Sequence, residues 1–364
     1  MAMKKLLPLA ALALLAPLAH APAVLAQASA NLAAGKTQPS PLAPSEIVAA
    51  APKGDWVGIA ASDLLVMDLT PGATGKPRRV VIQLMPVPFS QGWIGNIRLL
   101  AKAHWWDGLS INRVQDNYVV QWGDANGEDA KKAKVLPAGL AVMPESEYVT
   151  KYVPSMFSHY AANGFTKVPR NRTEFAKFSS GRPASPDHPS RFGDPYAGNV
   201  AFAYGFPVGL KWWVERKAGE IVNTGPDEVW PVHCYGMVGV GRDLSPNTGS
   251  GAELYVVIGH APRHLDRNIA LVGRVVEGIE HLSSLPRGTG GLGFYETPEE
   301  RTGIAAIRLG TEVSGLPTFE DLSTESVSFA KYADARANRR DAFFIRPAGG
   351  ADICNIPVPV RRVK

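Results

Sequence analysis

Cysteine is scarce in this sequence of 364 residues, which contains only Cys234 and Cys354. Two cysteines can form one intramolecular disulfide, so a scaffold held together by several disulfides is excluded. In an oxidising, exported compartment a bond between Cys234 and Cys354 would tie the C-terminus to the core. The alternative is that both are buried free thiols.

Runs of positive charge and long apolar segments are missing too. The formal net charge is +5, and no block of Lys or Arg is long enough to suggest nucleic acid binding. Beyond the N-terminus, no segment is long and apolar enough to span a bilayer. We therefore expect a mature chain with a mildly basic, solvated surface, no bound nucleic acid and no membrane span.

The N-terminus has the pattern of a secretory signal peptide. Two lysines precede an Ala/Leu-rich run from Leu6 to about Ala19, and small residues follow, with the best cleavage site after Ala26. Two prolines interrupt the run, which argues against a transmembrane anchor. We expect residues 1–26 to be removed and the protein to be exported, to the periplasm if the source is a Gram-negative bacterium.

The next part of the chain predicts a linker, a hairpin and a helix. Residues 27–54 are rich in Ala, Pro, Ser and Gln without periodicity, which is typical of a flexible linker. Two β-rich runs, Asp63–Leu69 and Arg78–Leu84, flank a turn rich in Pro and Gly. Ser90 is placed to cap a helix through about Ala103. The apolar residues of that helix share one face: Trp93, Ile97, Leu100 and Ala101.

Two further regions are expected to be additions to the main domain. Residues 125–235 contain a Pro- and Gly-rich loop at 181–196, and also Phe202–Val214 and Val229–Val232, which are apolar enough to pack as an inserted subdomain. Residues 314–364 predict a C-terminal extension. Its expected elements are a helix from Phe319 to Arg340 and strands at Phe343–Ile345 and Ile353–Val360.

The stretch His104–Asp124 contains an arginine and a glutamine at strand spacing. Ile111 and Arg113, and after a turn Val119 and Gln121, alternate as they would on one face of a β-ribbon. This pattern indicates a fixed cation beside an apolar hollow.

The same stretch resembles the signature of the cyclophilin peptidyl-prolyl isomerases. Its matching parts are Trp106–Gly108, Ile111–Val114 and Gln121–Asp124, and the later blocks that resemble the family in the same order are Met237–Gly241, Ser245–Tyr255, His264–Asp266 and Val276–Glu280. The resemblance covers about half of the mature chain. It implies a mainly β fold, a closed antiparallel eight-stranded barrel with two capping helices, at residues 55–313 around the insertion.

The resemblance also implies a reaction that needs no cofactor, metal or nucleophile. Rotation about an X-Pro bond breaks amide resonance and is slow without catalysis. Arg113 would donate a hydrogen bond that strengthens as the prolyl amide twists, and Gln121 would bind the substrate backbone. The family pocket for the prolyl ring maps onto Tyr118, Val119, Tyr255 and Leu265, with Glu253 and His264 beside it. The expected substrates are proline-containing exported polypeptides.

Several positions depart from the family pattern. They are Ile111 for phenylalanine, Asn112 for histidine, Trp122 for glycine, Glu253 for glutamine, His264 for tryptophan and Ile269 for histidine. Because Arg113 and Gln121 are retained, catalysis is expected, and the substituted pocket leaves its rate open. Glu253 either pairs with Arg113 and competes with substrate or points into solvent.

Other site motifs have less support. Gly288–Gly293 matches a dinucleotide-binding pattern but does not follow a strand, and Gly249–Gly251 is not the elbow of a serine hydrolase. His260 and His264 have helical metal-ligand spacing, yet Pro262 lies between them.

Two alternatives of other classes remain open. One is a cyclophilin-like, non-catalytic chaperone or peptide-binding module of the cell envelope, which the substituted pocket and the insertion favour. The other is a scaffold whose insertion and extension bind an envelope partner.

Overall fold

The computed structural model describes residues 41–72, 75–152, 194–197, 199–218, 220–348 and 350–363. The chain from Leu42 onwards forms one compact unit. The expected signal peptide, residues 27–40 of the expected linker and residues 181–193 of the expected loop lie outside the described residues. Within the described ranges, no helix is long and apolar enough to cross a membrane.

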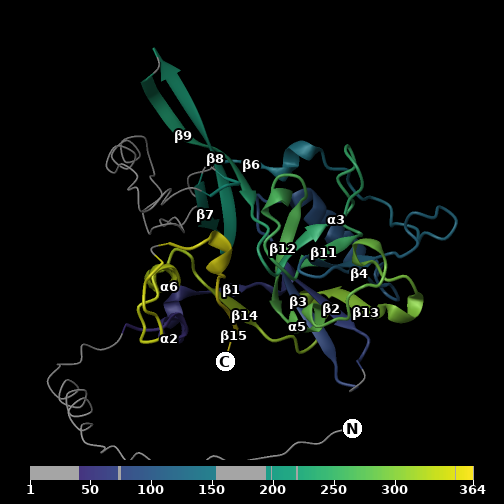
Figure 1. Cartoon of the computed structure of the whole chain (residues 1–364). Helices are drawn as coiled ribbons and strands as arrows, with labels where there is room; N and C mark the ends of the chain where they lie inside the picture. The colour runs from purple at the N-terminus through teal and green to yellow at the C-terminus, as the bar shows by residue number, and fades with distance from the viewer. Residues whose placement is uncertain are drawn as a thin grey trace, which may run out of the picture. The chain divides into compact units, whose positions relative to one another are not determined.

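Eight antiparallel strands close into a barrel, as expected (Figure 1). Around the barrel they follow the order β10 (Met237–Val240), β11 (Leu254–Val257), β5 (Val119–Gly123), β4 (Ser110–Val114), β13 (Thr302–Leu309), β2 (Leu64–Leu69), β3 (Arg78–Leu84) and β12 (Leu271–Glu277). The predicted hairpin is confirmed, since β2 and β3 pair antiparallel with Asp68 opposite Arg79.

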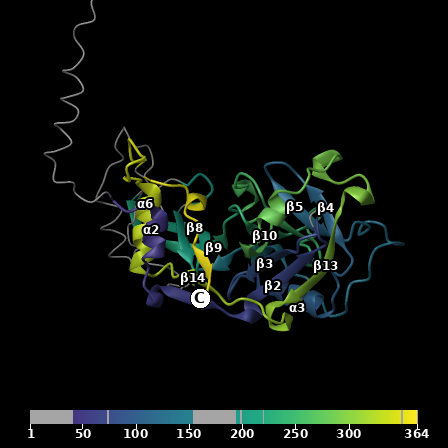
Figure 2. The same cartoon turned by 90° about the horizontal axis from the view of Figure 1, so that it is seen from below.

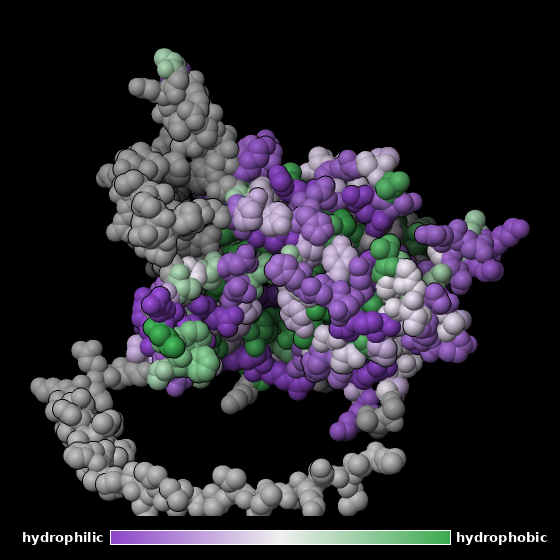
Figure 3. Space-filling model, viewed as in Figure 1, coloured by the Kyte–Doolittle hydropathy of each residue, from purple (hydrophilic) through white to green (hydrophobic). Residues whose placement is uncertain are grey.

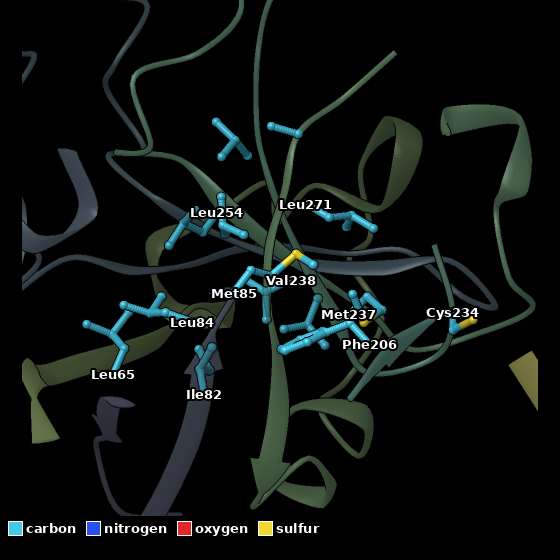
Figure 4. Close-up of a cluster of buried hydrophobic side chains, with 14 of the residues drawn as sticks. Leu65, Ile82, Leu84, Met85, Phe206, Cys234, Met237, Val238, Leu254 and Leu271 are labelled. Atoms are coloured by element: carbon cyan, nitrogen blue, oxygen red, sulfur yellow. The ribbon is translucent and has the colours of Figure 1, made fainter. Parts of the chain in front are cut away.

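Alternate residues along the strands belong to two different clusters, one inside the barrel and one between the barrel and the C-terminal extension. Leu65, Met67 and Ile82 belong to the main buried cluster, whereas Leu64 and Val81 form a second cluster with Phe319 of the extension. This is the period of two that a strand imposes on its side chains. Figure 4 shows barrel side chains gathered with Phe206 and Cys234, which belong to the same main cluster. On the face seen in Figure 3, the described residues are mostly hydrophilic, with hydrophobic ones between them.

The main helix, α3 (Gln91–Lys102), lies where the apolar spacing predicts it. The four residues expected to share a face are all buried: Trp93, Ile97, Leu100 and Ala101. The expected capping role of Ser90 is wrong, because Ser90 has a left-handed backbone, φ 52°, and its side chain makes no capping hydrogen bond. The second expected helix, α5 (Glu280–Ser283), has only four residues.

The insertion contributes a four-stranded antiparallel sheet. Its order is β6 (Thr150–Lys151), β9 (Glu220–Pro231), β8 (Phe206–Lys217) and β7 (Asn199–Ala203). The expected packing is confirmed for the residues of this region whose burial the structure describes, since Phe202, Phe206 and Val229 are buried in the main core cluster.

The N-terminal and C-terminal ends of the described chain pack together, which corrects two expectations. Residues 44–49 of the predicted linker form α2 (Pro44–Ala49), which lies beside α6 (Val327–Ala337) (Figure 2). A sheet joins β1 (Trp56–Ile59), β14 (Phe319–Leu322) and β15 (Val360–Arg362). The predicted helix from Phe319 is therefore wrong in its first part, because β14 is recruited by β1 from 260 residues earlier in sequence, as in the pairing of Ile59 with Phe319.

The two strands predicted within the extension are also corrected. Residues 343–345 form no strand, and Ile353–Asn355 is a 3₁₀ turn, so the final strand begins only at Val360. The disulfide between Cys234 and Cys354 is present, with the two Cα atoms 5.0 Å apart. The alternative of two free thiols is therefore wrong.

Candidate active site around Arg113

Arg113 and Gln121 lie opposite each other on neighbouring barrel strands, β4 and β5. The Arg113 Nη1 atom donates to the Gln121 Oε1 atom at 3.3 Å. A register shift between Ile111 and Arg113 interrupts the simple alternation that the sequence suggests. The shared face of Arg113 and Gln121 is nevertheless as predicted.

The remaining nitrogens of Arg113 are held by the protein itself. Its Nε atom donates to the Leu292 carbonyl at 2.7 Å, and its Nη2 atom donates to the Gln115 side chain. The guanidinium also lies over the rings of Tyr118 and Phe294, at 5.5 and 5.2 Å from their centroids. Burial lowers the pKa of Arg113, but a guanidinium still keeps its proton at neutral pH. The site therefore offers a fixed, partly desolvated cation beside aromatic rings.

The glycine-rich segment 288–294 is packed against β4 rather than arranged around a phosphate. The Gly288 amide donates to the Val114 carbonyl at 3.0 Å, and Phe294 forms a β-bridge with Arg113. Gly293 has φ +79°, and a Cβ atom there would lie 2.6 Å from the Cα atom of Gln115. Leu292 and Phe294 are thus site residues that the motif comparison misses, and the glycines are the sequence signal for their close approach.

Glu253 neither pairs directly with Arg113 nor points into solvent. Its Oε1 atom accepts a hydrogen bond from the Asp124 amide at 2.7 Å, and its carboxylate also receives one from the Gln121 side chain. Burial raises the pKa of Glu253 to about 7. Arg113, Gln121 and Glu253 therefore form a connected series in which Gln121 joins a permanent cation to a group that titrates near neutrality.

An apolar cluster lies next to the guanidinium. Its members come from the turn before β5, from β5, from β11 and from the loop before β12: Tyr118, Val119, Tyr255, Val257 and Ile269. Tyr118 and Ile269 are partly exposed, while Val119 and Tyr255 are buried below them. We call this set the Tyr118 cluster. It brings together three of the four residues expected to line the proline pocket.

Leu265 and His264 are not members of the Tyr118 cluster. Both belong to the 3₁₀ turn Arg263–Leu265, where His264 is exposed and Leu265 is half-buried. Ile269, which replaces the family histidine, occupies the cluster instead. The expected substrate contacts of Leu265 and His264 remain predictions.

Three of the residues that depart from the family pattern lie in the barrel interior or between the paired strands β4 and β5. Ile111 and Trp122 pair with each other and are fully buried. Asn112 is buried as well, donating to the Gly123 carbonyl at 2.9 Å and accepting from the Ser110 hydroxyl at 2.7 Å. These substitutions therefore alter the support of the site.

Three hydrogen-bonded polar side chains lie buried beneath the Tyr118 cluster, and no sequence motif predicts that they meet. The Tyr255 hydroxyl bonds His233 Nε2 at 2.8 Å, and His233 Nδ1 bonds the Asp266 carboxylate at 2.8 Å. No group of three or more His, Cys, Asp or Glu residues within the described ranges is arranged to hold a metal ion.

Comparison with known proteins decides the family. A family model described as cyclophilin type peptidyl-prolyl cis-trans isomerase/CLD matches residues 79–308. The chain belongs to this family. No curated protein matches the sequence. Arg113, Gln121 and the Tyr118 cluster all lie within the matched cyclophilin region.

One solved structure adds support for the fold. The chain is similar to the cyclophilin AquaCyp293 from Hirschia baltica, with a TM-score of 0.56, 18% identity and coverage of 85% of this chain and 94% of that one. A cyclophilin type peptidyl-prolyl cis-trans isomerase of Cryptosporidium parvum, determined with the dipeptide Ala-Pro, gives a TM-score of 0.34 and 9% identity over 68% of this chain and 98% of that one. The similarity to the Hirschia structure extends well beyond residues 79–308.

Proposed function

We propose that this cyclophilin catalyses cis/trans isomerisation of X-Pro bonds in exported polypeptides. The observation that carries the proposal is the position of the Arg113 guanidinium, fixed opposite Gln121 and beside the Tyr118 cluster. A prolyl ring resting on that cluster would present its amide to the arginine.

The chemistry follows from how the amide changes as it twists. In the planar ground state the nitrogen lone pair is delocalised, whereas in the twisted state it is localised and accepts a hydrogen bond. A donor fixed beforehand gains more from the twisted state than from the planar one, which lowers the barrier. Arg113 is the catalytic residue, Gln121 orients it and binds the substrate backbone, and no covalent step occurs.

A second candidate function is peptide binding without turnover. One observation favours it: each of the three guanidinium nitrogens already has a protein acceptor, at Leu292, Gln115 and Gln121. These bonds use three of the five N–H donors, so a substrate amide can accept only from the second N–H of Nη1 or Nη2, whose directions the three bonds fix. If neither of these donors is aimed at the amide of a bound prolyl ring, the protein binds proline-containing segments as a chaperone does, without turnover.

One assay separates the two functions. Exchange of an X-Pro tetrapeptide is followed by NMR with the mature protein and with Arg113→Ala, and the peptide's dissociation constant is measured for both. Isomerisation predicts exchange that falls by about 100-fold in the variant while binding changes little. Binding without exchange in the wild type would favour the chaperone function. Exchange that is equal in both proteins would exclude Arg113 as the catalytic residue.

Export is the second part of the proposal, and it rests on the signal-like N-terminus and on the disulfide. A disulfide is stable in an oxidising compartment such as the periplasm. Fractionation of cells that express the full chain, with N-terminal sequencing of the product, tests it. We expect the protein in the exported fraction with a new terminus after Ala26; an intact N-terminus in the cytoplasm would contradict export.

A further inference from the structure

A chain of buried polar groups runs from the Tyr118 cluster to the insertion. His233, Asp266, Arg263 and Tyr255 are each no more than 5% exposed. The chain begins at the Tyr255 hydroxyl, continues through His233 to Asp266 Oδ1, and passes from Asp266 Oδ2 to the Arg263 Nε donor at 2.6 Å. It is therefore continuous from the floor of the apolar cluster.

The direction of each hydrogen bond follows from the partners available. Asp266 Oδ1 accepts from both the backbone amide and the Nδ1 atom of His233, at 3.0 and 2.8 Å. The proton of the imidazole therefore sits on Nδ1, and Nε2 accepts from the Tyr255 hydroxyl. Burial lowers the pKa of His233 and raises that of Tyr255, which keeps both groups neutral. The single hydroxyl proton of Tyr255 is committed inward, which fixes the orientation of its ring.

The far end of the chain belongs to the insertion. Asp194 accepts both Nη donors of Arg263, at 2.7 and 2.9 Å, and its side chain is 3% exposed. Without Asp194, Arg263 would keep a buried charge with two unpaired donors, so its hold on Asp266 would be disturbed. The residue after His233 is Cys234, which the disulfide ties to Cys354 of the extension. Both additions to the barrel thus meet the chain that supports Tyr255.

We propose that Asp194 is a positioning residue that, acting through Arg263, Asp266 and His233, holds the Tyr255 ring in place and so sets the affinity of the Tyr118 cluster for the prolyl ring. This inference rests on the proposed use of the cluster as the proline site. None of the four supporting residues touches substrate. The insertion therefore tunes substrate binding, while Arg113 on β4 remains outside the chain.

Binding and turnover should respond differently when the series of hydrogen bonds from Asp194 to Tyr255 is interrupted. A ring already held in its binding position loses less conformational freedom when substrate arrives. Asp194→Asn should therefore raise the dissociation constant and the KM of an X-Pro tetrapeptide about threefold to tenfold. The kcat should change less than about twofold, because Arg113 and its partners are untouched. If Asp194 only stabilised the fold, Asp194→Asn would lower the amount of folded protein without raising KM selectively over kcat.

A double-mutant cycle tests the proposal. Asp194→Asn, Tyr255→Phe and the double variant are compared in peptide titrations and exchange assays, with thermal unfolding to check that each is folded. The control is Asp68→Asn, which breaks another two-bond carboxylate–arginine pair, with Arg79, on β2 and β3. Both single variants should weaken binding, the double variant should be no worse than Tyr255→Phe, and the control should bind as the wild type does.

The possible outcomes are distinct. Additive losses, or unchanged affinity in Asp194→Asn, would overturn the proposal, since Asp194 and Tyr255 would then act independently. If Asp194→Asn does not fold, Tyr255→Phe decides alone, because it removes only the hydroxyl, and unchanged affinity there would overturn the proposal. A wild type that binds but does not exchange would refute the proposed catalysis, while the dissociation constants would still test the positioning. A wild type that does not bind the peptide would overturn both.

Discussion

Arg113 and Gln121 face each other across the β4–β5 ladder, and the guanidinium donates to the amide oxygen at 3.3 Å. The Gln121 amide nitrogen can then donate in the other direction, to the buried Glu253 carboxylate. One glutamine thus orients the cation and satisfies a buried acid. Gln121 therefore acts together with Leu292 and Gln115, which hold the other two nitrogens of Arg113.

Replacing Gln121 by leucine should reduce catalysis without unfolding the protein. Gln121→Leu leaves Arg113 with its bonds to Leu292 and Gln115 but removes its orientation across the ladder. We expect kcat/KM for an X-Pro peptide to fall about tenfold. The measurement is NMR exchange, and the matched control is Gln91→Leu, which removes a glutamine that bonds two carbonyls at the start of α3. Equal activity in Gln121→Leu and the control would contradict the orienting role.

Glu253 should make stability depend on pH in the neutral range. Its folded pKa of about 7 lies above the ordinary value of 4.5, so the folded state holds the proton more tightly than the unfolded state. Between these values the free energy of unfolding should fall as the pH rises. The loss of stability from ionising the buried Glu253 carboxyl is complete above pH 7. The full effect is at most about 3 kcal/mol.

Glu253→Gln tests this pH dependence. The variant should lose the slope between pH 4.5 and 7, and it should be more stable than the wild type at pH 8 because no charge is buried. Urea unfolding at a series of pH values measures both. Glu299→Gln, at an exposed position, makes the same charge change and should keep the slope. A slope that persists in Glu253→Gln would assign the effect to another group.

Gly293 should be intolerant of a side chain. Alanine there meets the Gln115 backbone and adopts a left-handed conformation, which should cost about 1 to 3 kcal/mol and push Leu292 away from Arg113. Thermal unfolding and the exchange assay measure the two effects. Gly291→Ala is the matched control from the same 3₁₀ turn, since a Cβ atom there has no neighbour within 4 Å. Similar losses in both variants would show that the turn does not depend on this close contact.

The disulfide should contribute strongly to stability. It closes a loop with a sequence separation of 120 residues, so its loss should cost about 5 kcal/mol through the entropy of the unfolded chain. The double variant Cys234→Ser/Cys354→Ser should melt well below the oxidised wild type. Reductant should lower the melting temperature of the wild type to that of the variant and should leave the melting temperature of the variant unchanged. A wild type indifferent to reductant, once thiol titration has shown full reduction, would refute this role.

The elements that the sequence predicts best are those specified by neighbouring residues. The β2–β3 hairpin and the buried face of α3 follow from local alternation, turn residues and spacing. The joint placement of Arg113 and Gln121 is predictable for the same reason, because a short turn joins their strands. The α2 helix in the expected linker is missed, because a helix of six residues among prolines shows no periodicity of its own and depends on packing against α6.

The family, the barrel and the placement of an arginine opposite a glutamine can be predicted from the amino-acid sequence, because each depends on motifs or on residues close along the chain. Three features become visible only once the chain is folded: where Glu253 bonds, that Leu292 and Phe294 enclose Arg113, and that Asp194 connects to Tyr255. Those contacts join segments that are tens to hundreds of residues apart. Their geometry is set by how the closed barrel, the insertion and the extension pack, which no local pattern encodes.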